Sequence, residues 1–257
     1  MSGAPAPVSS RSLGKTNRAA AFAVSTTARC ITISLRRDRI GPAAARDLMA
    51  LLEAIEDDDG ILLLVMTGTG AGFCSGFDES VDPRLVESLA ALEKPVVAII
   101  NGDARDEGLE LALACDIRIA LASARFALTQ SRRGVIPSFG GTQRLPRLIG
   151  AAAAMRMILT GEAITALEAR RLGLVTYLAR NRAALGRVTG EVKSSILTRG
   201  PLAVRIAKQA VLKGYDMTLA QGIRLEEDLY ALLQTSADRE EGIRAFLEKR
   251  KPLFKGA

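Results

Sequence analysis

The sequence predicts an α/β protein. Short apolar runs rich in β-branched residues alternate along the chain with longer stretches in which apolar residues recur at helical spacing. With 257 residues, the chain is long enough to bury a full hydrophobic core. No apolar run approaches the roughly 18 residues that a membrane-spanning helix needs. The alternation therefore favours strands covered by helices over an all-helical or an all-β architecture.

The individual elements follow from these runs in chain order. Four runs are predicted to be strands, at residues 29–35, 61–67, 95–100 and 116–121. Helices are expected between them, at residues 42–55, at residues 85–92 and from Glu107 or Gly108 onward. Asn101-Gly102 closes the third strand with a turn that leads toward the last of these helices.

The pattern changes near Gly200-Pro201, after which only helical periodicity continues to the C-terminus. We therefore predict a core region at residues 1–199 and a helical region at residues 200–257. Residues 1–37 contain six Lys or Arg and no acid, a composition that weakly resembles a transit peptide. The favoured interpretation is a disordered N-terminus, with residues 1–17, approximately, expected to be flexible.

Two segments carry motifs that point to a known family. Residues 94–150 contain a strand that ends in Asn-Gly, a turn leading into a helix with Glu110, and the loop IPSFGGTQRLPRLIG. Residues 68–78 read GTGAGFCSGFD, similar to a segment usually written GxGxxFCAGxD. Together they resemble the crotonase superfamily, which includes the enoyl-CoA hydratases and isomerases. The resemblance begins near residue 30 and implies a crotonase-like ββα spiral core with a C-terminal α-helical trimerisation region.

The resemblance also implies an oxyanion hole made by the backbone N–H groups of Phe77 and Glu107. Family members carry a Gly triplet at the second donor, where this chain reads Asp106-Glu107-Gly108. A backbone N–H survives this substitution, but the Glu side chain adds bulk and, if ionised, a charge facing the developing enolate. The favoured interpretation is that Asp106 and Glu107 lie at the positive end of the helix and point into solvent.

Proton transfer must rely on carboxylates, or on Lys, Tyr or Cys, because the chain contains no histidine. Glu110 matches the first of two catalytic glutamates in the hydratases, and Leu109 and Leu111 flank it in an apolar segment. Gln130 occupies the position of the second glutamate. Gln cannot transfer a proton at neutral pH, although its amide can hold a water or a carbonyl. Losing one positioned acid or base typically costs about 10²–10⁴ in rate.

Asp106 and Glu107 are the carboxylates nearest in sequence that could replace the missing acid. Asp106 lies four residues before Glu110 and Glu107 lies three before it, so either pair could share a helix face. Like-charge repulsion would then raise one pKa. Crowding at the surface without a function is the favoured interpretation.

The coenzyme A site is expected to involve the C-terminal segment FLEKRKPLF at residues 246–254. By resemblance, Phe246 and Lys249 contact the CoA nucleotide, and Arg37 or Arg39 is a further candidate. Lys and Arg suit this role through their charge and their hydrogen bonds to phosphate. No cofactor is expected beyond the coenzyme A that forms part of the substrate.

Composition restricts the partners. The net charge of +7 would fit an anionic polymer, but ten aromatic residues and no Trp disfavour a nucleic-acid partner. Three cysteines fall within strand or helix patterns without metal-ligand spacing, which predicts reduced core residues in a cytoplasmic protein and no metal site: Cys30, Cys74 and Cys115. The resemblance implies a homotrimer, or a hexamer formed by two trimers.

The sequence thus predicts an enzyme that adds water to a 2-enoyl-CoA through an enolate held by the oxyanion hole. Glu110 is expected to act as base or acid, and Gln130 to orient water or substrate. Two alternatives stay open: an isomerase or decarboxylase of the same family, and a catalytically weak acyl-CoA-binding protein. A nucleic-acid-binding member is a third alternative that depends on net charge alone.

Overall fold

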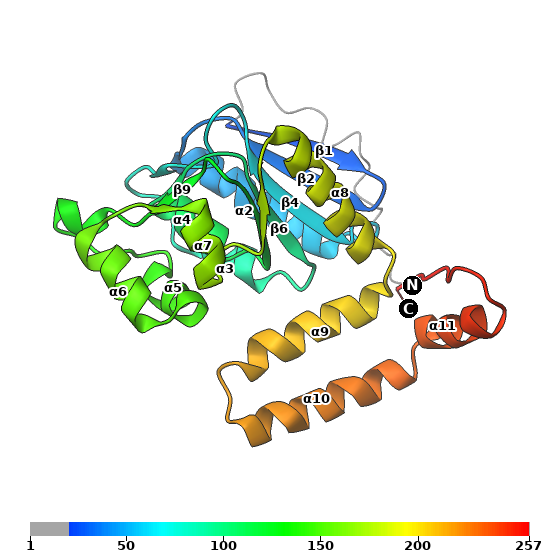
Figure 1. The fold of residues 1–257 in the computed structure, drawn as a ribbon. Coiled ribbons are helices and arrows are strands. Elements are labelled where there is room, and N and C mark those ends of the chain that lie inside the picture. The colour runs from blue at the N-terminus through cyan, green and yellow to red at the C-terminus, as the bar shows by residue number, and fades with distance from the viewer. Residues whose placement is uncertain (1–20, 257) are drawn as a thin grey trace, which may run out of the picture. The chain divides into compact units, whose positions relative to one another are not determined.

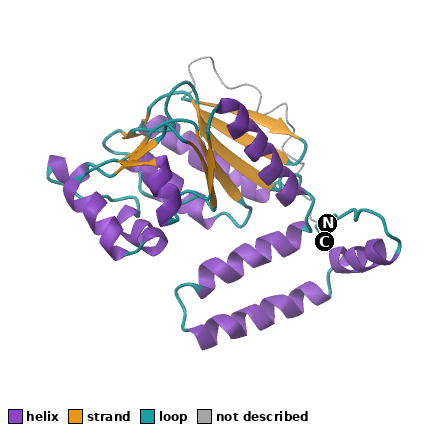
Figure 2. Ribbon diagram, viewed as in Figure 1, coloured by secondary structure: helices purple, strands orange, loops and turns teal. Residues whose placement is uncertain are grey.

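The computed structural model describes residues 21–256, so the segment expected to be flexible, about residues 1–17, lies outside the described residues. The chain divides into two compact units. Among the described residues, the core unit covers residues 21–92 together with Val96–Glu191, and the C-terminal unit covers Glu93–Pro95 and residues 192–256. The core unit combines strands with helices, whereas the described part of the C-terminal unit is helical (Figure 2).

A six-stranded sheet forms the centre of the core unit (Figure 1). Its order is β1-β2-β4-β6-β8-β11, with β1 antiparallel to β2 and every other neighbouring pair parallel. Side chains along β4 and β6 are almost all buried, as expected for parallel strands covered on both faces. The strands span Phe22–Thr27 (β1), Cys30–Leu35 (β2), Leu63–Gly68 (β4), Val96–Ile100 (β6), Ile117–Leu121 (β8) and Tyr177–Ala179 (β11).

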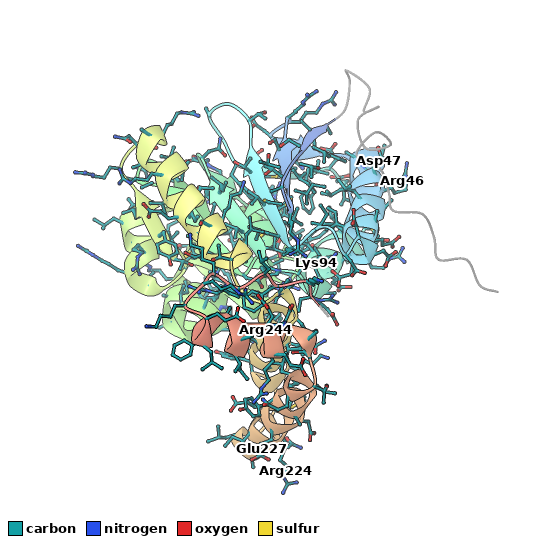
Figure 3. The ribbon with its side chains drawn as sticks, turned by 90° about the vertical axis from the view of Figure 1, so that its right-hand side faces the viewer. Arg46, Asp47, Lys94, Arg224, Glu227 and Arg244 are labelled. Atoms are coloured by element: carbon teal, nitrogen blue, oxygen red, sulfur yellow. The ribbon has the colours of Figure 1, made fainter. Side chains whose placement is uncertain are left out.

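Helices follow most of these strands. In α2 the apolar side chains Ala45, Leu48 and Leu52 are buried, whereas Arg46 and Asp47 are exposed on its outer side (Figure 3). This helical spacing places one apolar stripe against the core. The helices of the core unit span Pro42–Asp57 (α2), Arg84–Ala91 (α3), Glu107–Leu113 (α4), Gly141–Ile149 (α5), Ala151–Thr160 (α6) and Ala166–Leu172 (α7), and Arg182–Leu197 (α8) crosses into the C-terminal unit.

Short strands support the loops around α4. A parallel pair joins β3 (Arg39–Ile40) to β5 (Gly76–Phe77). A three-stranded sheet has the order β10-β9-β7, formed by Ile164–Thr165, Arg125–Ala127 and Ala104–Arg105. One 3₁₀ turn, η1 (Gln130–Arg133), follows β9.

The C-terminal unit contains α9 (Pro201–Gly214), α10 (Leu219–Gln234) and α11 (Ala237–Leu247). Helix α9 starts at a proline, whose fixed φ suits the first helical turn. Helix α10 starts with a capping box between Thr218 and Gln221, and α9 and α10 pack against each other.

The α/β prediction is confirmed, and so are the four predicted strands and the helices at residues 42–55, at residues 85–92 and from Glu107. All three cysteines are buried, and none of them forms a disulfide within the described residues. Between residues 21 and 256, no helix combines the length and apolar character needed to cross a membrane.

Candidate active site

Glu110 is a buried carboxyl group of the core unit with several hydrogen-bond partners. It lies on the first turn of α4 and is fully buried. Its Oε1 accepts hydrogen bonds from the backbone N–H groups of Phe139 (2.8 Å) and Gly141 (2.7 Å). Its Oε2 accepts a hydrogen bond from Gln130 Nε2 at 3.2 Å. Both oxygens of the carboxyl group are therefore fixed in position.

Burial raises the pKa of Glu110 to about 7, and the two backbone N–H groups oppose this rise because they stabilise the ionised form. The charge of Glu107 adds to the rise and that of Arg144 lowers it. A carboxyl group with a pKa near 7 can both take up and release a proton at neutral pH. This property distinguishes a candidate catalytic acid or base from an ordinary surface glutamate.

The Gly140-Gly141 pair makes this arrangement possible. A Cβ added at Gly141 would lie 2.9 Å from Glu110 Oε1 and 3.0 Å from Pro137 Cβ, so any larger residue would displace the carboxylate. Gly140 has φ +94°, a left-handed conformation that glycine adopts without strain. The two glycines let the loop bring both donors close to one oxygen.

Gln130 opens η1 and is 2% exposed. While its Nε2 donates to Glu110, its Oε1 is buried without a hydrogen-bond partner among the described residues. A buried unpaired carbonyl oxygen is costly, and it is a ready acceptor for a water or hydroxyl group that enters the site. The two positions matched to the hydratase glutamates are thus in direct contact.

Glu107 does not point into solvent, and the interpretation that it does is wrong. Its side chain is only 14% exposed, and Oε2 accepts a hydrogen bond from the backbone N–H of Phe77 at 3.1 Å. That N–H is one of the two donors expected to form the oxyanion hole. Glu107 Oε1 also lies 3.9 Å from Arg133 Nη2. The Gly triplet of the family has no side chain at this position. In this chain, the Glu107 carboxylate contacts the Phe77 N–H, the predicted oxyanion-hole donor.

Asp106 is also buried rather than solvated, with a side chain 11% exposed. Its carboxylate accepts hydrogen bonds from Thr129 N (2.5 Å) and Thr129 Oγ1 (2.9 Å), and Arg133 Nη2 lies 3.4 Å away. Asp106 has φ +47° and ψ −124°, a conformation that costs a non-glycine residue about 1–3 kcal/mol. The contacts with Thr129 hold the start of α4 in this strained geometry. Surface crowding is therefore not the explanation for these carboxylates.

The structure brings four predicted residues together, Glu110, Gln130, Phe77 and Glu107. Arg39, on β3, donates from Nε to Asp78 Oδ1 at 3.1 Å, next to the Phe77 strand. Arg37 is exposed on the loop between β2 and β3.

The two residues predicted to contact the CoA nucleotide belong to the C-terminal unit. Phe246 is 82% exposed, and the Lys249 backbone N–H donates to its carbonyl oxygen. Contacts of Lys249, Phe246 and Arg37 with the nucleotide stay predictions.

Sequence reasoning missed Phe139, Gly141, Thr129 and Arg133. The Gly140-Gly141 pair was a usable signal, since paired glycines indicate close approach of another group. Nothing in the sequence indicated that Thr129 would bind Asp106. No group of three His, Cys, Asp or Glu side chains within the described residues is placed to hold a metal ion.

Comparisons with known proteins identify the family to which the chain belongs. The enoyl-CoA hydratase/isomerase family profile matches residues 30–257. An (E)-benzylidenesuccinyl-CoA hydratase of Thauera aromatica is 39% identical over 233 residues, or 85% of this chain and 91% of that protein. A crotonyl-CoA hydratase of Syntrophomonas wolfei is 37% identical over 217 residues, or 78% and 83% of the two chains. The crystal structure of an enoyl-CoA hydratase from Bacillus anthracis superposes with a TM-score of 0.88 at 36% identity, covering 92% of this chain and 100% of that one. The expected fold family is confirmed.

Proposed function

Because the chain belongs to the enoyl-CoA hydratase/isomerase family, we propose that Glu110 moves the proton when water adds to a 2-enoyl-CoA thioester. The protein is an acyl-CoA enzyme of the hydratase type. One observation supports the role of Glu110 most directly. It is a fully buried carboxyl group with a pKa of about 7, positioned by two backbone N–H groups and by Gln130.

The proposed reaction uses one carboxylate twice. Ionised Glu110 takes a proton from water while the water oxygen forms a bond to the β-carbon, and the electrons of the double bond move to the thioester oxygen. The N–H groups of Phe77 and Glu107 stabilise the enolate that results. Glu110 then gives the proton to the α-carbon, so one water is added across the double bond. Gln130 Oε1, a buried acceptor without a partner among residues 21–256, orients the water.

Several finer assignments belong to the same proposal. Phe246, Lys249 and Arg37 would bind the CoA nucleotide. Coenzyme A would enter as part of the substrate, with no separate cofactor. The assembly would be a homotrimer or a pair of stacked trimers, and its location the cytoplasm. Family membership supports these assignments.

The decisive experiment compares initial rates of crotonyl-CoA hydration by the wild type and by Glu110→Gln. We expect the variant to lose about 10²–10⁴ in rate, because the amide can accept the same backbone hydrogen bonds but cannot move a proton. Binding of butyryl-CoA, which has no double bond to hydrate, should be retained. Glu53→Gln, which removes an exposed carboxylate from α2, is the matched control and should hydrate normally.

A second function is favoured by two specific observations. Gln130 replaces an acid, and the Glu107 carboxylate occupies the Phe77 N–H. Both fit a protein that binds acyl-CoA with little turnover. Butyryl-CoA binding without crotonyl-CoA hydration by the wild type would favour this function and contradict hydration. Hydration that is unaffected in Glu110→Gln would exclude Glu110 as the proton carrier.

A further inference from the structure

The Phe77 N–H is directed away from the strand that pairs with it. Beside the β3–β5 pair, the neighbouring N–H of Asp78 donates to Ile40 O at 2.9 Å. The N–H groups of successive strand residues point in opposite directions. The Phe77 N–H therefore points toward α4, where Glu107 Oε2 accepts it at 3.1 Å.

Gly76 provides the space for this contact. A Cβ at Gly76 would lie 2.5 Å from Glu107 Oε2 and 2.9 Å from Arg39 Nη1. The carboxylate thus lies directly over the glycine that precedes the donor. An oxygen atom of a thioester that approached the Phe77 N–H would need the same position.

Together these contacts assign Glu107 a role in substrate affinity. We propose that the Glu107 carboxylate competes with the thioester oxygen for the Phe77 N–H, and so lowers the affinity for acyl-CoA. This inference depends on the proposed function, because it takes the Phe77 N–H as the site of the thioester oxygen. In the free protein the carboxylate bonds to the donor, and substrate binding requires it to leave.

Displacement of the carboxylate has a defined alternative. Arg133 Nη2 lies 3.9 Å from Glu107 Oε1, and its side chain is half exposed. A modest rotation of the Glu107 side chain toward Arg133 would replace one charge-assisted contact with another. Asp106, bound to Thr129, keeps the backbone of α4 in place while this side chain moves. The competition therefore involves one side chain and not the helix.

The size of the effect follows from the population of the occupied state. If the carboxylate bonds to the Phe77 N–H in about nine molecules out of ten, the apparent dissociation constant for acyl-CoA is about tenfold weaker than the intrinsic one. Free coenzyme A has no thioester carbonyl, so its affinity should not depend on this competition.

The test measures calorimetric Kd values for butyryl-CoA and for free coenzyme A with the wild type, Glu107→Ala and Glu107→Gln. We expect Glu107→Ala to bind butyryl-CoA about tenfold more tightly and coenzyme A with unchanged Kd. Glu107→Gln should show a smaller gain, since its amide oxygen still accepts from Phe77 without a charge. Glu53→Ala removes the same charge from α2 and should change neither Kd.

Two patterns of binding would overturn the inference. If Glu107→Ala bound butyryl-CoA and coenzyme A more tightly by the same factor, Glu107 would merely repel the CoA phosphates. Unchanged or weaker butyryl-CoA binding by Glu107→Ala, with its fold verified by circular dichroism, would mean that the carboxylate does not compete. Crotonyl-CoA hydration distinguishes this inference from the proposed function. If the wild type hydrates crotonyl-CoA but Glu107→Ala does not bind butyryl-CoA more tightly, the proposed function stands and this inference is wrong. If Glu107→Ala binds butyryl-CoA more tightly but the wild type does not hydrate crotonyl-CoA, this inference stands and the proposed function is wrong. If no variant binds butyryl-CoA, both are wrong.

Discussion

Glu107 and Glu110 leave the same helix one turn apart, and both carboxylates accept hydrogen bonds from backbone N–H groups of other segments. Their surroundings differ. Glu110 is fully buried and bonded to two N–H groups and an amide, whereas the Glu107 side chain is 14% exposed and bonded to one N–H group. Arg133 lies near Glu107, and burial raises the pKa of Glu110 to about 7.

The comparison shows how one helix supplies two carboxylates with different properties. A carboxylate fixed by three donors but removed from water keeps its geometry and gains affinity for a proton. A carboxylate fixed by one donor at a partly open position can exchange that donor for another partner. The first arrangement suits proton transfer and the second suits displacement by substrate.

The largest effect concerns stability at different pH values. Because the pKa of Glu110 is raised from 4.5 to about 7 on folding, the protonated form stabilises the folded state and this contribution is lost as the pH rises toward 7. Glu110→Gln cannot ionise. Its free energy of unfolding relative to the wild type should therefore rise by about 3 kcal/mol between pH 4.5 and pH 8.

Urea denaturation across this pH range measures the difference. Glu53→Gln is the control, because Glu53 is exposed on α2, and its difference from the wild type should stay within about 0.5 kcal/mol at every pH. A constant difference between wild type and Glu110→Gln would show that burial does not perturb this carboxyl group, and would remove the contrast with Glu107.

The next effect comes from the glycine beneath the Glu110 carboxylate. In Gly141→Ala the added Cβ would lie 2.9 Å from Oε1, so the carboxylate must shift. A misplacement of about 1 Å can cost about 10² in rate, and we expect crotonyl-CoA hydration to fall by that factor. Gly186→Ala adds the same methyl group on α8, where no atom beyond the backbone of its own helix lies within 4 Å, and should hydrate normally. Equal rates for both variants would mean that the carboxylate position is not critical.

Sequence reasoning predicted one half of this comparison and not the other. The Glu110 and Gln130 positions follow from motif spacing, because motifs record which backbone positions face the site. The direction of the Glu107 side chain does not follow, since it depends on a hydrogen bond to Phe77, 30 residues away in the chain. The helix start suggested solvent, because Asp and Glu commonly lie exposed at helix N-termini. Tertiary contacts with Thr129 and Phe77 replaced water as the partner of both carboxylates.

The fold was more predictable than the site for a related reason. Strands such as β4 and β6 are specified by continuous apolar runs, and their burial needs only the local pattern. The two-residue strands β3 and β5 were not predicted, because a pair of residues carries no periodicity. Yet this pair directs the Phe77 N–H toward α4. Elements too short to show a pattern thus determine much of the geometry of the site.

The third effect is on the pH dependence of activity. If ionised Glu110 accepts the proton of water, kcat/KM for hydration should fall about tenfold for each pH unit below its pKa of about 7. The rate at pH 6 would then be about one tenth of the plateau value. Circular dichroism over the same range controls for loss of structure. A flat profile between pH 5.5 and 8 would contradict Glu110 as the base and leave the more exposed Glu107 as the carboxylate to examine.

The smallest effect concerns the strained residue just before both glutamates. Asp106→Ala and Asp106→Gly each remove the carboxylate that binds Thr129, but only Gly adopts φ +47°, ψ −124° without strain from a Cβ. We expect both to be destabilised, with Asp106→Gly more stable than Asp106→Ala by about 1 kcal/mol.

Asp47→Ala and Asp47→Gly are the matched controls, for which the expected difference in stability has the opposite sign. Asp47 lies exposed in the interior of α2 (Figure 3), where Gly should be less stable than Ala by about 1 kcal/mol. Urea unfolding of the four variants measures both differences. If the Ala variant were more stable than the Gly variant at both positions, the start of α4 would not be strained. The contacts with Thr129 would then be unnecessary for holding α4 in place, and the helix itself could move when Glu107 leaves the Phe77 N–H.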